Sequence, residues 1–328
     1  MKTTHHILKA LSLGMLIGFT FPVFAQDPLP LGEIASFEAG EFSLLATTTV
    51  SERLLVADDA NDEIRIFDIS NPSQPRLVTT VPLEGSPRSI AGGDEFGLVV
   101  VEIDDQAILQ VIFPSGGRRE VWEGIPLIDL PTADLDLTIN AESTWGLLAN
   151  TSTIGILEIV AFDNINSRFE RLQSTATGLF QDHVFSAQPS GEVSIFALSA
   201  GPDWDETEEI DFEGEINNFN FSAEHDLGIA LMDDSIVLFS LSDANILSQF
   251  DLDTAYSSTA FIESDDEQWL SLLSARGNEL RLLDITNPDE IVDLGTRTLD
   301  VPIRDWVTYH ELFITTNGQQ VNFLAANP

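Results

Sequence analysis

Short apolar runs and polar turns follow one another in a fixed order along this chain. Residues 54–57 read LLVA, which is typical of a short buried strand, and residues 58–62 (DDAND) predict a turn after it. Residues 63–69 then alternate with a period of two, as a second strand does. An Asn-Pro step predicts another turn, because proline fixes φ, and residues 76–83 read as the returning strand. The pattern therefore predicts a small antiparallel sheet.

The same pattern returns at a distance. Residues 64–83 (IRIFDISNPSQPRLVTTVPL) align without a gap with residues 280–299 (LRLLDITNPDEIVDLGTRTL), an offset of 216 positions. Weaker copies at residues 196–199 and 239–243 fit a repeat of about 43 residues, and the offset of 216 is close to five such repeats. A unit of four short strands with almost no helical periodicity is typical of a β-propeller blade.

The predicted fold class is all-β: a single β-propeller whose seven four-stranded blades start near residues 42, 84, 128, 178, 214, 254 and 300. The last unit contains only three strands, and residues 31–39 (LGEIASFEA) resemble a lone fourth strand ahead of the first unit. We therefore expect the N-terminal strand to complete the C-terminal blade, which closes the ring and leaves no unpaired edge. Six blades are the alternative, because the unit at 178–213 is short. The propeller domain is expected to span residues 26–328.

The run LLVADDANDEIRIFDISNPSQPRLV resembles the LVIVD repeat of bacterial and archaeal extracytoplasmic β-propellers. The resemblance is clearest at residues 54–83 and 272–299 and elsewhere is limited to the general pattern. It implies the propeller fold and a location outside the cytoplasm, and it implies no defined activity. In the second to fifth units the aspartate of the DIS motif is replaced by Ile112, Ala161, Ala197 and Ser240. We therefore interpret Asp68 and Asp284 as structural residues that cap the following turn.

Residues 1–25 predict a secretory signal peptide, with two lysines near the start, an apolar run at 10–21 and a small residue, Ala25, before the cleavage point. The apolar run is shorter than the roughly 20 residues that span a bilayer, so we expect cleavage and no stable membrane insertion afterwards. The sequence has no cysteine, which excludes disulfides, a lipid-modified cysteine and thiolate metal sites. We expect a periplasmic or secreted monomer, and the sequence leaves the choice of compartment open.

The predicted mature chain is strongly acidic. Without Lys2 and Lys9 it has 12 arginines, no lysine and 54 acidic residues, a formal net charge of −42. This charge disfavours nucleic acid and anionic lipid as partners and favours cations or basic proteins. Adaptation to salty water is the simpler explanation, because dissolved ions screen the self-repulsion of such a surface.

Carboxylates gather on the turns between the second and third strands of three units. We call the face onto which these turns open the acidic face, and its candidate binding residues are Asp58, Asp59, Asp62, Asp104, Asp105, Asp233 and Asp234. Because such turns emerge on one side of a propeller, we expect this face to be unusually negative around the central channel and to bind an extracytoplasmic protein or a cationic ligand. We expect no cofactor. Ca²⁺ is the alternative, since it takes six to eight oxygen ligands, but the order of an EF-hand loop is absent.

The aromatic residues and histidines give weaker evidence for a functional site than the acidic turns do. Trp204, flanked by carboxylates on a long turn, is either an aromatic anchor for a partner or a ring folded back over its own blade. Trp145 and Trp269 recur before second strands, which favours packing between blades. The histidines of the mature chain are dispersed around the ring: His183, His225 and His310. No catalytic motif occurs, so we assign no catalytic residue and no metal ligand.

These observations predict a non-enzymatic secreted or periplasmic module that binds a protein or another ligand. The alternative is a propeller hydrolase or lactonase with a metal in the central channel. That activity requires polar side chains from several first strands to converge on the axis of the ring. The predicted first strands and their neighbours offer Arg88, Asp136, Asn217, Asn218, Asn220, Arg304 and Asp305. This set is polar, but it is not a carboxylate-rich cage.

The structural interpretation of Asp68 can be tested by Asp68→Ala. Because the substitution removes a turn cap, we expect the free energy of unfolding to fall by about 1 kcal/mol. Partner binding should not change. Urea denaturation measures the free energy of unfolding, and a binding assay on the same preparation measures partner binding. A loss of binding at full stability would contradict a capping role.

Overall fold

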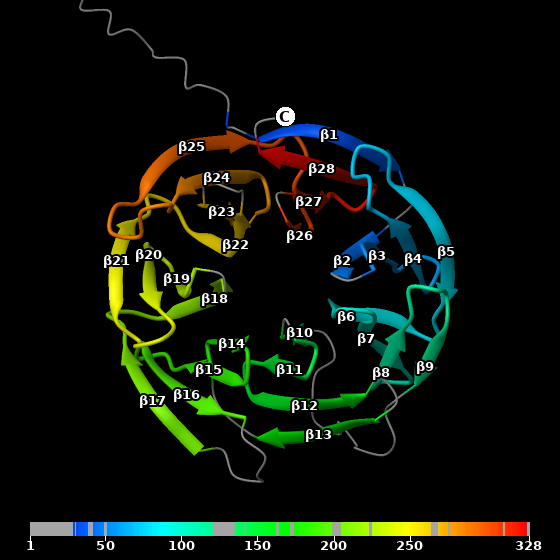
Figure 1. Ribbon diagram of the computed structural model, residues 1–328, viewed down its shortest axis with the longest axis horizontal. Coiled ribbons are helices and arrows are strands. Elements are labelled where there is room, and N and C mark those ends of the chain that lie inside the picture. The colour runs from blue at the N-terminus through cyan, green and yellow to red at the C-terminus, as the bar shows by residue number, and fades with distance from the viewer. Residues whose placement is uncertain are drawn as a thin grey trace, which may run out of the picture.

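The computed structural model shows seven four-stranded antiparallel sheets arranged in a ring, a seven-bladed β-propeller (Figure 1). It describes residues 29, 31–38, 42–48, 51–120, 135–140, 142–161, 164–170, 174–198, 205–222, 225–263, 268–274, 276–310 and 312–326. The predicted signal peptide and Trp204 lie outside these residues. No helix long and apolar enough to cross a membrane occurs in the described part of the chain.

The strands of each blade are given below in order from the innermost to the outermost. Blade one contains β2 (Phe42–Thr48), β3 (Arg53–Asp58), β4 (Glu63–Asp68) and β5 (Arg76–Pro82). Blade two contains β6 (Ser86–Gly92), β7 (Gly97–Ile103), β8 (Gln106–Ile112) and β9 (Arg118–Glu120). Blade three contains β10 (Asp136–Ile139), β11 (Trp145–Asn150), β12 (Thr153–Ala161) and β13 (Asn164–Glu170). Blade four contains β14 (Ala176–Phe180), β15 (His183–Ala187), β16 (Glu192–Ala197) and β17 (Asp205–Asp211).

The remaining blades follow the same order. Blade five contains β18 (Ile216–Ser222), β19 (Leu227–Met232), β20 (Ser235–Ser240) and β21 (Ile246–Asp251). Blade six contains β22 (Tyr256–Glu263), β23 (Gln268–Ser274), β24 (Glu279–Asp284) and β25 (Val292–Thr298). Blade seven contains β26 (Asp305–Tyr309), β27 (Leu312–Thr316), β28 (Gln320–Ala326) and β1 (Leu31–Glu38). The predicted number of seven blades is thereby confirmed, and the alternative of six is excluded.

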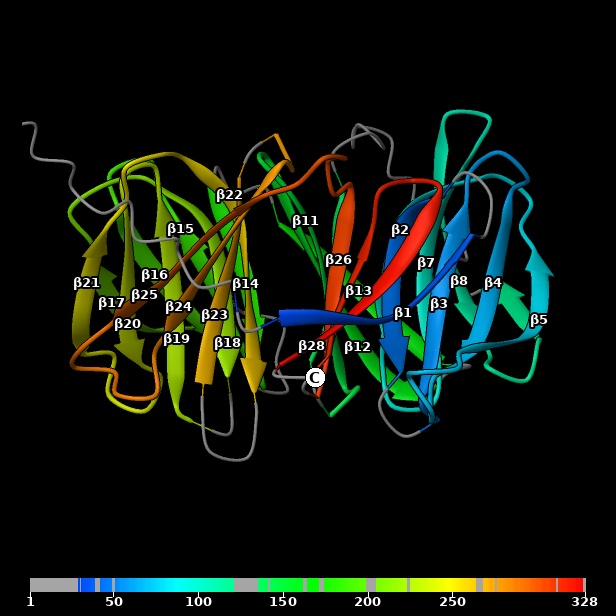
Figure 2. The same ribbon diagram turned by 90° about the horizontal axis from the view of Figure 1, so that it is seen from above.

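The N-terminal strand closes the ring, as predicted. β1 pairs with β28 in antiparallel register, from Leu31 opposite Ala326 to Glu38 opposite Gln320, with an irregularity between Glu33 and Ala35. Figure 2 shows β1 crossing the outside of blade seven next to β28. The first and last strands of the chain thus belong to one sheet, and the edge of β28 is covered rather than open to solvent.

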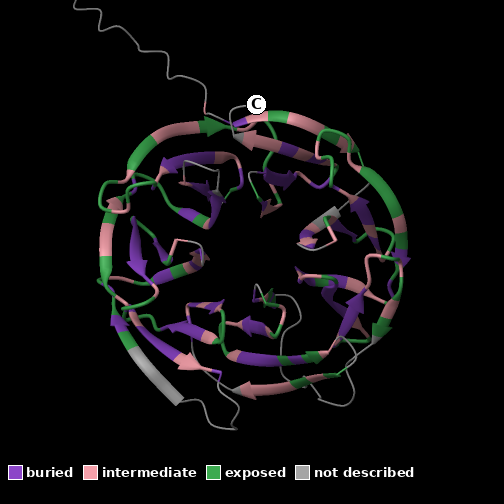
Figure 3. Cartoon of the chain, viewed as in Figure 1, coloured by how far each residue is buried: buried purple, intermediate pink, exposed green. Residues whose placement is uncertain are grey.

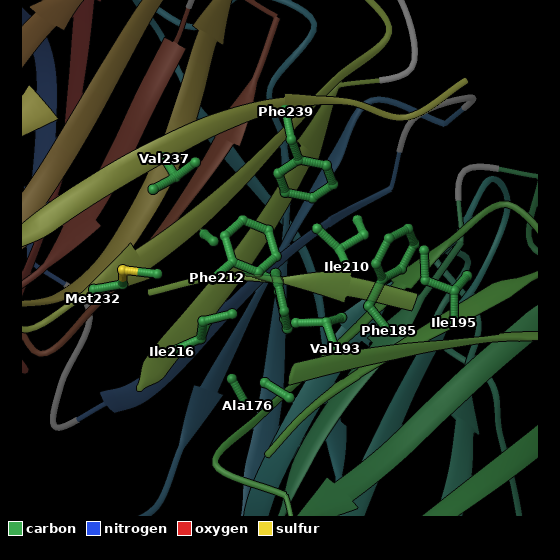
Figure 4. Packing of buried hydrophobic residues seen from close by; sticks show 13 residues of the cluster. Ala176, Phe185, Val193, Ile195, Ile210, Phe212, Ile216, Met232, Val237 and Phe239 are labelled. Carbon is green, nitrogen blue, oxygen red and sulfur yellow. The ribbon is translucent and has the colours of Figure 1, made fainter. Parts of the chain in front are cut away.

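Apolar contact between neighbouring blades forms the core. The described residues contain seven buried apolar clusters, and each cluster joins two adjacent blades around the ring. The middle strands are buried on both faces, and every residue of β19 and β20 is buried. Figure 3 shows the buried residues concentrated on the inner and middle strands, with exposed residues on the outer ones. Figure 4 shows one cluster, in which Phe212 of blade four meets Phe239 of blade five edge to face at 5.6 Å.

The two recurring tryptophans pack between blades, as predicted. Trp269 is buried with Leu31 and Phe313 between blades six and seven. Trp145 packs, partly buried, against the cluster that joins blades three and four. Aromatic rings of this size contribute large buried areas, so both residues stabilise the ring rather than face a ligand.

A recurring backbone hydrogen bond joins the end of a blade to its own inner turn. The N–H of Leu83 donates to the carbonyl of Asp62 at 2.7 Å, and the N–H of Leu252 donates to the carbonyl of Asp234 at 2.7 Å. Leu299 makes the same bond to Asn278 at 2.8 Å. Each bond fixes the point where the chain leaves one blade for the next.

The aspartates of the DIS motif cap turns. Asp68 Oδ1 accepts hydrogen bonds from the N–H of Ser70 at 3.1 Å and from its hydroxyl at 2.7 Å. Asp284 Oδ1 accepts one from the N–H of Thr286 at 2.9 Å. The hydrogen bonds from Ser70 are the main cause that holds the pKa of Asp68 below its usual value. This geometry agrees with the structural role predicted for both residues.

Removal of β1 tests the closure. A chain that begins at residue 39 leaves the edge of β28 unpaired, and an open edge promotes association with other chains. We expect this variant to aggregate or form oligomers, while the chain that begins at residue 26 stays at one size. Size-exclusion chromatography with light scattering distinguishes the two outcomes. A monodisperse, fully folded variant would show that blade seven does not need its fourth strand.

Candidate functional site

The acidic turns and the beginnings of the innermost strands lie on the same face of the ring. Because the strands of a blade are antiparallel, the start of the innermost strand lies next to the end of the second strand. Phe42 pairs with Asp58, Ser86 with Glu102, and Asp305 with Thr316. The turns that follow these second strands therefore surround the opening of the channel on the acidic face.

Five of the seven candidate carboxylates on this face are exposed. Asp104 and Asp105 form the two-residue turn between β7 and β8 with φ values of 50° and 63°. Two successive positive φ values match a type I′ turn, which aspartate tolerates better than most residues. Asp59, Asp233 and Asp234 are exposed on the corresponding turns of blades one and five. Backbone geometry thus accounts for part of the acidic pattern, and it leaves these side chains facing solvent.

Asp58 and Asp62 have structural partners instead. The Asp58 side chain is fully buried, and its Oδ2 lies 2.8 Å from the guanidinium of Arg65 and accepts a hydrogen bond from Asn61 Nδ2 at 3.0 Å. Its Oδ1 accepts two backbone N–H groups of its own turn. Asp62 is half-buried and accepts a hydrogen bond from the hydroxyl of Ser86 in blade two at 3.2 Å. Asp58 is therefore inaccessible to a partner, and Asp62 links two blades.

A cavity of about 1050 Å³ occupies the central channel. Its walls come from the innermost strands of blades two, three, four, five and seven, and from turns next to them. Polar residues that the sequence offered to the channel form part of the lining: Arg88, Asp136, Asn217, Asn218, Asn220 and Asp305. Arg304 is exposed and is not part of the lining.

Two carboxylates approach this cavity from opposite sides of the ring. Asp305 begins β26 and Asp136 begins β10, and Figure 1 shows these strands facing each other across the channel. Asp305 is half-buried. Its Oδ2 accepts the N–H of Leu45 in blade one at 2.6 Å, and its Oδ1 accepts the N–H of Trp306 at 2.8 Å. Asp136 is exposed.

The environment of Asp305 changes its protonation. Burial is the largest cause, and it raises the pKa of Asp305 to about 7; the charge of Asp136 acts in the same direction. The backbone hydrogen bonds from Leu45 and Trp306 act in the opposite direction. The channel therefore holds a carboxyl group that exchanges its proton near neutral pH, coupled to a second carboxylate across the cavity.

Two side chains connect the cavity with the acidic turns. Arg88 Nε donates to Glu102 at 2.8 Å, which pairs the cavity's arginine with a carboxylate of blade two. Asn217 Nδ2 donates to Asp233 Oδ1 at 2.8 Å on the turn of blade five. The channel opening and the acidic turns thus form one continuous polar surface.

The remaining candidate residues do not converge. His183 lies 2.9 Å from Asp182, His225 contacts Gln268, and His310 packs against Tyr309 at 4.4 Å, each in a different blade. Among the described residues, no group of three or more histidine or acidic side chains is placed to hold a metal ion. Bound Ca²⁺ stays a prediction, and Trp204 lies outside the described residues.

No protein-family model matches the sequence, and no curated protein does. Many solved structures share the fold. One is the crystal structure of the β-propeller domain of Cps50 (Swd1) from Myceliophteria thermophila, with a TM-score of 0.66 and 12% sequence identity. The match covers 90% of this chain and 99% of that one. At this identity the similarity shows the propeller fold alone, and the resemblance to LVIVD repeats stays a prediction.

Blade four contributes cavity residues that the sequence did not reveal. Thr175, Thr177 and Gln181 line the channel from β14 and its flanks. The strand itself reads ATGLF, which is too short and too glycine-interrupted to predict a register. The polar residues spaced two apart at 175 and 177 were the available signal.

The raised pKa of Asp305 predicts a pH-dependent stability. An unfolded aspartate ionises near pH 4, whereas Asp305 in the folded chain ionises at about 7, so the folded state binds more protons between these values. The contribution of Asp305 is therefore fully present below pH 4 and is lost as the pH rises through 7. We expect Asp305→Asn to gain stability relative to the wild type by up to roughly 4 kcal/mol between pH 4 and pH 8.

Urea denaturation of both proteins across this pH range provides the measurement. Asp234→Asn is the matched control, because it removes an exposed carboxylate from the same face. A difference between Asp305→Asn and the wild type that stays constant from pH 4 to pH 8 would rule out the raised pKa.

Proposed function

We propose that this protein is a non-enzymatic interaction module that acts outside the cytoplasm and binds a basic protein on its acidic face. β-Propellers support protein interaction in general, because a rigid ring presents turns from many blades on one surface. The observation that carries the proposal is the set of exposed carboxylates on turns of blades one, two and five next to the channel opening: Asp59, Asp104, Asp105, Asp233 and Asp234.

Electrostatics favours a basic partner. A net charge of −42 for residues 26–328 attracts positive surfaces and repels nucleic acid and anionic lipid. Exposed charges around an interface steer association and increase the on-rate more than they increase affinity. Binding through this face should therefore weaken as salt screens the attraction.

The location and the assembly state form part of the proposal. The N-terminal segment with the features of a signal peptide and the absence of cysteine support a secreted or periplasmic monomer. The resemblance of residues 54–83 to LVIVD repeats supports the same location.

A hydrolase or lactonase active in the channel is the second candidate. The observation in its favour is the coupling of Asp305, which titrates near neutral pH, to Asp136 in the same cavity. A carboxyl group whose pKa is raised to about 7 can act as the acid next to a second carboxylate. The described residues supply no set of three side chains for the metal that this candidate also requires.

Capture from envelope extract tests the interaction. The chain from residue 26 is immobilised and exposed to native extract at several salt concentrations, with and without calcium. We expect a basic protein to be retained in stoichiometric amount and released by salt. A variant with Asp59, Asp104, Asp105 and Asp234 replaced by asparagine should not retain it. Asparagine tolerates the positive φ of the type I′ turn, so the backbone is preserved.

The control removes the same number of charges from the opposite face. Glu95→Gln, Asp182→Asn, Asp289→Asn and Glu290→Gln change exposed side chains on turns of that face. We expect this variant to retain the partner as the wild type does. Equal loss in both variants would show that only the total charge matters. No retained protein under any condition would contradict the proposal and favour substrate screening against the channel.

A further inference from the structure

We propose that the central channel is a second binding site, specific for an organic cation that bears ammonium or guanidinium groups and lies between Asp136 and Asp305. This site lies within the channel, whereas the protein partner proposed above contacts the exposed turns around the channel opening, so either proposal can fail without the other.

The cavity has the size and shape for such a ligand. Its volume of about 1050 Å³ is slightly above the usual range for small-molecule sites, about 300–1,000 Å³, so a ligand of this class has room to enter. Carboxylates approach from β10 and β26 on opposite sides, and Asn217 and Asn218 line it from β18. Trp306, Phe219 and Phe221 add aromatic surface to the lining. An amine with an aliphatic body matches this combination of charged and apolar groups.

The charged residues of the cavity lining indicate that the ligand is positively charged. Arg88 contributes the positive charge of the described lining, and the hydrogen bond of its Nε to Glu102 offsets that charge. Asp136 and Asp305 repel each other, and a cation between them replaces repulsion with attraction on both sides. An anionic ligand would be repelled by these carboxylates and by the net negative charge of the whole protein.

Binding should be linked to proton release. Asp305 carries a proton part of the time near pH 7, and a bound cation favours the ionised form. Of the strands packed against β26, β2 and β27 contain no charged residue, and β22 contains Tyr256 and Glu263. Asp136, Glu142 and Arg88 are the other charged groups that line the same cavity. The affinity should therefore increase as the pH rises through 7, by about tenfold between pH 6 and pH 8 for one proton released.

Isothermal titration of the chain from residue 26 with spermidine tests the inference at constant ionic strength. We expect one saturable site whose affinity rises about tenfold from pH 6 to pH 8. Asp136→Asn and Asp305→Asn should each weaken binding at pH 8 by at least about tenfold, since each removes one carboxylate contact. Asp305→Asn should also abolish the pH dependence.

Two further variants keep the outcome interpretable. Thr138→Trp fills the cavity from β10 without changing its charge and should abolish binding even if a carboxylate variant fails to fold. Asp104→Asn with Asp105→Asn removes two carboxylates from the acidic face and should leave the affinity unchanged. The inference is overturned if spermidine shows no saturable site, if Thr138→Trp binds normally, or if the turn variant loses as much affinity as the channel variants.

Discussion

The structure depends on the requirement that each blade cover both of its faces. The middle strands of a blade are apolar on both sides, so a blade standing alone would expose two hydrophobic surfaces to water. The clusters between blades meet this requirement, with one cluster at each of the seven interfaces of the ring. A linear array would leave its two end blades half uncovered. A closed ring has no end blades, and the pairing of β1 with β28 completes blade seven, which then packs against both of its neighbours.

This arrangement also decides where polar chemistry can occur. The interfaces between blades are largely apolar, which leaves the two faces of the ring, the outer strands and the channel for charged groups. An innermost strand packs against neighbours along its sides and faces the channel with alternate residues, so it can carry Asp136, Asn217 or Asp305 without disrupting the core. The turns on the acidic face carry charge for a second reason, since positions such as Asp104 and Asp105 need residues that accept positive φ.

The fold could be predicted because its signals are local and repeated. Alternating strands, Asn-Pro turns and the spare strand at 31–39 each lie within a few residues, and repetition reinforces them. The site depends on contacts that the sequence does not display. Asp58 looked like a surface carboxylate, but Arg65, seven positions later, pairs with it inside the blade. Asp136 of blade three and Asp305 of blade seven line the same cavity from opposite sides of the ring. The repeat pattern of the sequence does not show that these two residues face the same space.

The closure has a consequence for biosynthesis. A ribosome makes β1 first and β28 last, and these two strands pair with each other. Blades one to six can form their sheets as they emerge, but blade seven lacks a partner strand until translation of residues 320–326 is complete. The nascent chain therefore remains an open arc throughout elongation, and the native ring appears in a single late step.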